Sequence, residues 1–189
     1  MSYQTFGIIL RQMDRGEADQ FFTIYAKNLG KITALGRGTK KITSKLNYHL
    51  QSLAVVDLFL APGKNFYHIA GVNLVYNFSK IKNDFKKIIF ACFALELVDK
   101  LTKTDLAEEK IYHLLIKYFL ALEKNNFTKK QWAMVQQAFV VKFLTILGLA
   151  PKEEIAASPT KLDNFLNEHL EAELLTKNFL QNMVLTPHL

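Results

Sequence analysis

A run of positive charge between residues 27 and 45 is the part of the sequence best suited to chemistry. No acidic residue lies between Asp19 and Asp57, and the charged residues in this window are all cations: Lys27, Lys31, Arg37, Lys40, Lys41 and Lys45. Glycines at 30, 36 and 38 interrupt the run, which is typical of a loop that turns or approaches a ligand closely. Such a loop suits a polyanion, and a nucleic-acid backbone is the commonest one. A solvated surface loop explains the charge equally well.

Two aromatic residues could add base stacking to this charge. Phe21 and Tyr25 alternate with Lys27 along one face of a strand that we predict over residues 19–28. The alternative is that both rings cover one end of a barrel or pack against the helices. The sequence therefore proposes eight residues for nucleic-acid binding: Lys27, Lys31, Arg37, Lys40, Lys41, Lys45, Phe21 and Tyr25.

The sequence lacks the patterns of known catalytic and metal sites. Glu109 and His113 stand four residues apart, but the second histidine of an HExxH zinc site is missing. Cys92 is the only cysteine, which excludes an intramolecular disulfide and any multi-cysteine metal site. We therefore predict a binding protein rather than an enzyme, with no metal, no cofactor and no catalytic residue.

The elements that must position the basic run change character at Ser79. Before it, apolar residues recur with period two in short segments, expected near residues 5–11, 19–28, 31–35, 50–60 and 66–76. After it, the period is about 3.6, which predicts helices over residues 80–100, 105–124, 129–147 and 159–182. Five short strands favour a small barrel, because closure leaves no exposed edge. The expected fold class is α+β: a five-stranded OB-type barrel domain at 1–78 and an all-α domain at 79–189.

Capping signals mark where three of these helices should begin. Asp105 with Glu108, and Thr128 with Gln131, have the spacing of a capping box. Pro159 follows a serine, at the first helical position where proline is favoured.

The charge and the hydrophobicity of the sequence indicate where the protein is expected in the cell. The net charge is +7, and residues 1–79 hold nine Lys/Arg against four Asp/Glu, so the positive potential belongs mainly to the barrel. The N-terminus shows no signal-peptide pattern, and the longest apolar run, Ile88 to Leu95, is too short to span a bilayer. We expect a soluble cytoplasmic protein that is not associated with membranes.

Several short motifs follow one another in the first part of the chain: Gly7-Ile8-Ile9-Leu10-Arg11, Gly16-Glu17-Ala18-Asp19, Phe22-Thr23, Gly30-Lys31-Ile32, Gly36-Arg37-Gly38, Ser44-Lys45-Leu46 and Leu50-Gln51. In their order and spacing they resemble the RecO family of bacterial recombination mediators. Beyond residue 80 the resemblance thins to the helical pattern, Phe143-Leu144 and the segment from Leu147 to Pro151. No cysteine follows Pro151, so the four-cysteine zinc module of many family members cannot form.

This resemblance implies an N-terminal OB fold and a helical C-terminal domain. It implies binding of single- and double-stranded DNA, annealing of complementary strands, and help in loading RecA onto DNA covered by single-stranded DNA-binding protein. The implied partners are RecR and the acidic C-terminal tail of the single-stranded DNA-binding protein. Two other hypotheses stay open: an OB-type RNA-binding module, and a protein-interaction adaptor whose basic loop is only solvating.

Overall fold

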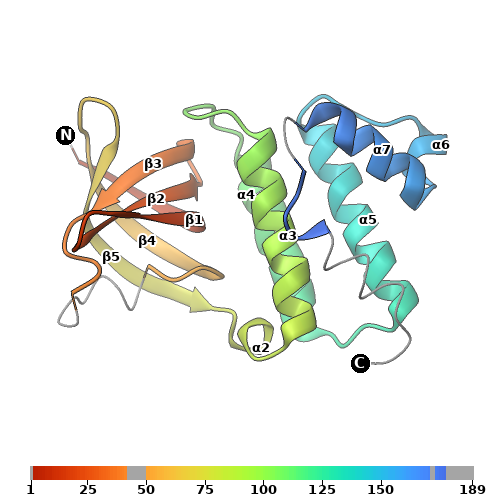
Figure 1. Cartoon of the computed structure of the whole chain (residues 1–189), viewed down its shortest axis with the longest axis horizontal. Helices are drawn as coiled ribbons and strands as arrows, with labels where there is room; N and C mark the ends of the chain where they lie inside the picture. The colour runs from red at the N-terminus through yellow and green to blue at the C-terminus, as the bar shows by residue number, and fades with distance from the viewer. Residues whose placement is uncertain (1, 42–49, 171–172, 178–189) are drawn as a thin grey trace. The chain divides into compact units, whose positions relative to one another are not determined.

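The chain forms two structural units and passes between them three times (Figure 1). The computed structural model describes residues 2–41, 50–170 and 173–177. One unit comprises the residues up to Ser79 together with Thr102–Tyr112, and the other comprises Lys80–Leu101 together with the chain from His113 onward. The return of Thr102–Tyr112 to the first unit is a feature that the boundary expected after residue 78 does not include.

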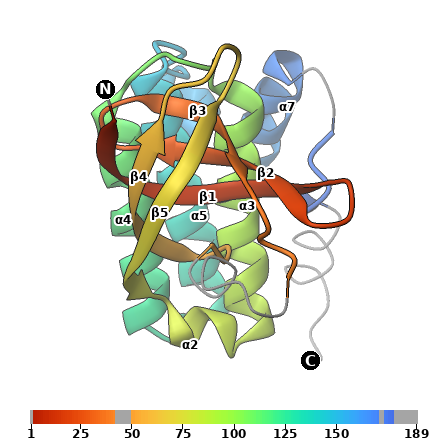
Figure 2. The ribbon, with the colours of Figure 1, turned by 90° about the vertical axis from the view of Figure 1, so that its left-hand side faces the viewer.

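The first unit is a closed five-stranded barrel, which confirms the predicted α+β fold class with an OB-type domain. Its strands are β1 (Tyr3–Arg15), β2 (Asp19–Ala26), β3 (Gly30–Gly36), β4 (Ala54–Ala61) and β5 (Tyr67–Asn77). They are joined in the order β1-β2-β3-β5-β4, and every neighbouring pair is antiparallel except β3 and β5. In Figure 2, β5 crosses β1 obliquely, as expected of strongly twisted strands in a small barrel.

Alternation along β2 separates the inside of the barrel from its outside. Phe22, Ile24 and Ala26 are fully or almost fully buried and belong to the barrel core, as the period-two pattern predicts. In β1, a register shift between Ile9 and Arg11 adds a bulge, and Ile9 supplies the core contact from this strand. Burying each large apolar side chain in this way contributes about 1.5–3 kcal/mol of folding free energy.

The connection between the first two long helices, α3 (Phe85–Leu101) and α4 (Glu109–Lys124), attaches to the edge of β3. We call Thr102–Glu108 the α3–α4 segment. In it, Thr104 forms a parallel bridge with Lys31, and the Asp105 N–H donates to the Lys31 carbonyl over 2.9 Å. Asp105 has φ of 60°, so it does not begin a helix, and the predicted capping box with Glu108 is wrong. Helix α4 (Glu109–Lys124) starts later, because the backbone around residue 105 bonds to β3 instead.

The second unit consists of helices α2 (Ser79–Lys82), α3 (Phe85–Leu101), α5 (Lys129–Ile146), α6 (Glu153–Ala156) and α7 (Pro159–His169), together with most of α4. The single helix predicted over residues 80–100 is divided, because the Asp84 carboxylate accepts from the Lys87 N–H and begins a new helix. The Thr128–Gln131 capping box is present with both of its bonds. Helix α7 begins at Pro159 as predicted but ends at His169, well before residue 182.

Aromatic side chains pack the helices of the second unit together. The ring of Phe90 on α3 lies 4.4 Å from that of Trp132 on α5, between ring centroids. Tyr118 on α4 lies 4.5 Å from Phe139 on α5, and its hydroxyl donates to the Phe90 carbonyl over 3.4 Å. In the part of the chain that the structure describes, no helix combines the length and hydrophobicity needed to cross a membrane.

Candidate nucleic-acid interface

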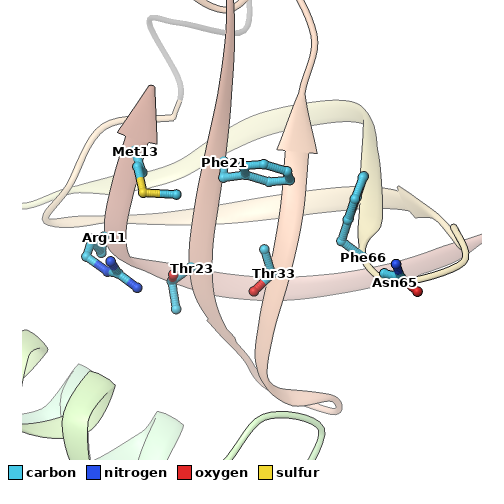
Figure 3. Close-up of a pocket in the computed structure, with 7 residues that line it drawn as sticks. All are labelled: Arg11, Met13, Phe21, Thr23, Thr33, Asn65 and Phe66. Atoms are coloured by element: carbon cyan, nitrogen blue, oxygen red, sulfur yellow. The ribbon is translucent and has the colours of Figure 1, made fainter. Parts of the chain in front are cut away.

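The outer side of β1, β2 and β3 carries an open pocket of about 290 Å³, shown in Figure 3. We call it the strand-face pocket, and it is lined by Arg11, Met13, Phe21, Thr23, Thr33, Asn65 and Phe66. Strand register explains the arrangement, since Arg11 pairs with Thr23 and Thr23 pairs with Thr33 across the three strands. Asn65 and Phe66 close the pocket from the loop between β4 and β5.

Two phenylalanine rings and a guanidinium form a cluster at this pocket. The rings of Phe21 and Phe66 meet edge to face, with centroids 5.1 Å apart at 80°. The Arg15 guanidinium lies 4.9 Å from the Phe21 centroid and 5.5 Å from the Phe66 centroid, within the range of cation–π attraction. Both rings are only partly buried, so they can offer a stacking surface beside a positive charge.

We call residues 36–45 the basic loop. Residues 36–41, which the structure describes, form hydrogen bonds with the turn that follows Arg15. The Gly38 N–H donates to the Asp19 carboxylate over 2.7 Å, and the Lys40 N–H donates to the Ala18 carbonyl over 3.0 Å. Arg37 and Lys41 are exposed and form no ion pair within the described residues. The structure thus brings these predicted cations to the same turn as Arg15.

Two of the predicted cations are partly neutralised by acidic residues. The Lys40 ammonium lies 2.7 Å from the Asp14 carboxylate, and this hydrogen bond, with a second from Gln20, lowers the pKa of Asp14. The Lys27 ammonium lies 3.2 Å from the Glu109 carboxylate. Neither ion pair could be predicted from the acid-free sequence between Asp19 and Asp57, because the acidic partners, Asp14 and Glu109, lie outside it.

Lys31 and Lys45 are the other two predicted lysines. Lys31 is half-buried, and its backbone is paired to the α3–α4 segment. Lys45 lies outside the described residues.

The prediction that Tyr25 offers a stacking surface is wrong. Tyr25 is on the outer side of β2, as predicted, but it is 0% exposed and its hydroxyl donates to the Glu108 carbonyl over 3.0 Å. Burial raises the pKa of Tyr25 to about 12, which keeps this donor protonated. The physical reason is that Tyr25 packs with the α3–α4 segment, which the strand pattern alone does not reveal. Phe21 is the predicted aromatic residue that lines the strand-face pocket.

Comparison with protein families identifies the chain. The model described as "Recombination protein O N terminal" matches residues 1–78, and the one described as "Recombination protein O C terminal" matches residues 82–158. The chain belongs to the RecO family. This agrees with the resemblance drawn from the motifs of the first eighty residues.

Several curated DNA repair proteins named RecO are similar to this RecO-family chain. The protein from Acetivibrio thermocellus is 26% identical over 185 residues, which cover 96% of this chain and 72% of that protein. Those from Roseiflexus sp. and Clostridium perfringens are each 29% identical and are covered over 51% and 56% of their length. The chain thus spans little more than half the length of some relatives and nearly three quarters of another.

Sequence reasoning missed three residues of the candidate interface in this RecO-family chain: Arg11, Arg15 and Phe66. Arg15 was hidden because β1 extends beyond the predicted end of its strand, and Phe66 because its loop meets β2 only in the folded barrel. One signal in the sequence could have found them: side chains alternate between the two sides of a strand, and this alternation places Arg11, Met13 and Arg15 on one side of β1.

Among the described residues, no group of three or more His, Cys, Asp or Glu side chains could hold a metal ion.

Proposed function

We propose that this chain is a recombinational DNA repair mediator that binds single- and double-stranded DNA and anneals complementary strands. The observation that supports this most is the strand-face pocket, where Phe21, Phe66 and Arg15 meet on the outer side of the barrel. OB barrels bind oligonucleotides on the face of strands two and three, between the loops that follow strands one and four. Strand β1 ends at Arg15, directly before the first of these loops, and Phe66 belongs to the second loop.

The roles of the side chains follow from their chemistry. Phe21 and Phe66 stack on bases whatever the DNA sequence, because every base has an apolar face. Arg15, Arg37 and Lys41 neutralise phosphates without reading base identity. Two strands whose phosphates are neutralised repel each other less, which allows complementary strands to pair. No covalent step is required, so the proposed activity is not enzymatic.

The wider role is proposed from the family. DNA repair is part of the names of the relatives, and the family models are those of a recombination protein. We infer that the chain helps to load RecA onto DNA covered by single-stranded DNA-binding protein, with RecR and the acidic tail of that protein as partners. A cytoplasmic, nucleoid-associated location follows from this role.

Salt-titrated binding and strand annealing test the DNA-binding core of the proposal. Three cations, Arg15, Arg37 and Lys41, predict a log–log salt slope of about −2 for single strands, at about −0.7 per phosphate. Arg15→Gln should weaken binding, slow annealing and flatten the slope by about 0.7. Lys161→Gln, an exposed lysine on α7, is the matched control and should change none of these.

Other outcomes would favour the competing hypotheses. Tighter binding of RNA than of DNA of one sequence at equal salt would indicate an RNA-binding module. A chain with no salt-sensitive affinity for nucleic acid would instead be an interaction adaptor, and the proposed function would be wrong.

A further inference from the structure

A second cavity adjoins the strand-face pocket and is bounded by a segment from outside the five strands. It encloses about 240 Å³ between the β4–β5 loop and the α3–α4 segment, and we call it the loop pocket. The residues with polar side chains that line it are Thr33, Lys64, Asn65, Tyr67, Thr104 and Asp105. Thr33, Asn65 and Phe66 line both pockets, so the two cavities are neighbours.

The lining of the loop pocket is rich in hydrogen-bonding groups. It offers a carboxylate, an amide, three hydroxyls and one ammonium, whereas the strand-face pocket presents rings and a guanidinium. Its volume lies below the range of about 300–1,000 Å³ that holds drug-sized ligands. A flat group the size of one nucleobase suits a cavity of this size and polarity.

Backbone contacts with β3 hold Asp105 at this pocket. Its N–H donates to the Lys31 carbonyl, and the neighbouring Thr104 is bridged to the same residue of β3. The carboxylate itself is exposed and forms no hydrogen bond or ion pair within the described residues. The pKa of Tyr67, which lines the same pocket, is raised mainly by burial and further by the charges of Asp105 and Tyr3. The Asp105 carboxylate therefore acts electrostatically on this residue of the pocket wall.

We propose that the loop pocket takes one base of a bound strand and prefers guanine, through Asp105. The Watson–Crick edge of guanine presents two adjacent N–H donors, N1–H and the 2-amino group, which match the two oxygens of a carboxylate. Adenine, cytosine and thymine each place an acceptor beside their donor on this edge, and the carboxylate repels it. The preceding or following base would stack at Phe66, and Lys64 would neutralise a phosphate.

This inference rests on the proposed function and adds base selectivity to it. A partner's arginine side chain also presents paired N–H donors, and it is the other occupant that a carboxylate could take. Phe66 lines both pockets, and this favours a nucleic-acid strand, because one strand can fill two neighbouring cavities with successive nucleotides.

The test compares three strands that differ at a single base. They are oligothymidine, the same strand with one central deoxyguanosine, and the same strand with deoxyinosine, which lacks the 2-amino group. The deoxyguanosine strand should bind roughly 5- to 10-fold tighter than oligothymidine, and deoxyinosine should lose most of this gain. Asp105→Asn should bind all three equally, because its amide replaces one of the two acceptor oxygens by an NH2 donor, which cannot pair with a second N–H of guanine. Asparagine tolerates the positive φ of residue 105, so the backbone is retained.

Two control variants separate this effect from general electrostatics. Asp57→Asn removes a carboxylate from the outer side of β4, where Gln4 bonds it, and should keep the preference for deoxyguanosine. Lys64→Ala should weaken all three strands alike.

The outcomes distinguish the proposed guanine preference from the proposed function of DNA binding on which it rests. If the unmodified chain binds all three strands equally well, or if Asp105→Asn keeps the preference, the loop pocket is not a guanine site and DNA binding stands. If the chain binds none of the strands, both proposals are overturned.

Discussion

Replacing Asp14 by asparagine should strengthen DNA binding by freeing a lysine of the basic loop. Lys40 and Asp14 form an ion pair over 2.7 Å, and the Asp14 side chain is well exposed to solvent. The hydrogen bonds from Lys40 and Gln20 lower the pKa of Asp14, so the carboxylate stays ionised at neutral pH and holds the ammonium. Asparagine keeps the size of the side chain and removes the charge that competes with phosphate.

The magnitude follows from counterion release. One additional phosphate contact on a single strand steepens the log–log salt slope by about 0.7, which corresponds to roughly fivefold tighter binding at about 0.1 M salt. The gain should disappear on extrapolation to about 1 M salt, where the released counterions no longer favour binding. The melting temperature should hardly change, because exposed ion pairs contribute little to folding.

The assay is fluorescence anisotropy of a labelled oligothymidine over a series of salt concentrations. Asp57→Asn is the matched control, since it removes one negative charge from the outer side of β4 and so changes the net charge equally. It should leave the slope unaltered. The double variant Asp14→Asn with Lys40→Ala should return to the affinity of the unmodified chain, which assigns the gain to Lys40.

Two results would refute this reasoning. Equal changes for Asp14→Asn and Asp57→Asn would show that only the net charge matters. A full loss of 0.7 in slope for Lys40→Ala alone would show that the ion pair does not compete with phosphate, whereas we expect the larger losses from Arg37→Ala and Lys41→Ala.

Three further predictions address stacking, backbone fit and pH. Phe66→Ala should weaken single-strand binding by about 1–3 kcal/mol with the salt slope intact, while Phe59→Ala on β4 should have no effect in the same titration. Gly30→Ala should lower the free energy of unfolding in urea by more than Gly16→Ala. Both glycines have positive φ, which costs alanine about 1–2 kcal/mol, but only at residue 30 would the added Cβ collide with the α3–α4 segment. Stability should fall as pH rises above 10, because the raised pKa of Tyr25 keeps its proton in the folded chain while the unfolded chain loses it; thermal melts of Tyr25→Phe should show a smaller loss, and an identical loss would contradict this.

The strands and their inner and outer sides could be predicted because local periodicity encodes them directly. Phe22, Ile24 and Ala26 had to face one way and Phe21 the other, whatever the rest of the chain did. The start of α5 could be predicted for the same reason, since Thr128 satisfies backbone groups only three residues away.

The α3–α4 segment could not be predicted, because what fixes it is distant in sequence. Asp105 and Glu108 have the spacing of a helix start, and local capping would satisfy the same backbone groups that β3 satisfies in the fold. Pairing of Thr104 and Asp105 with Lys31 leaves no periodic signal. The burial of Tyr25 depends on the same pairing, so both expectations failed together.

The charge of the interface is set by strand pleating rather than by runs of like residues. Asp14 and Arg15 are adjacent in sequence and cancel in any count of charge along the chain. In β1 they point to opposite sides, so Arg15 joins Phe21 at the strand-face pocket, while Asp14 pairs with Lys40 of the basic loop. Asp14 therefore lowers the charge available from the loop and leaves that of the pocket intact. For this reason its substitution should change the salt dependence of binding through Lys40, while stacking at Phe21 stays as it is.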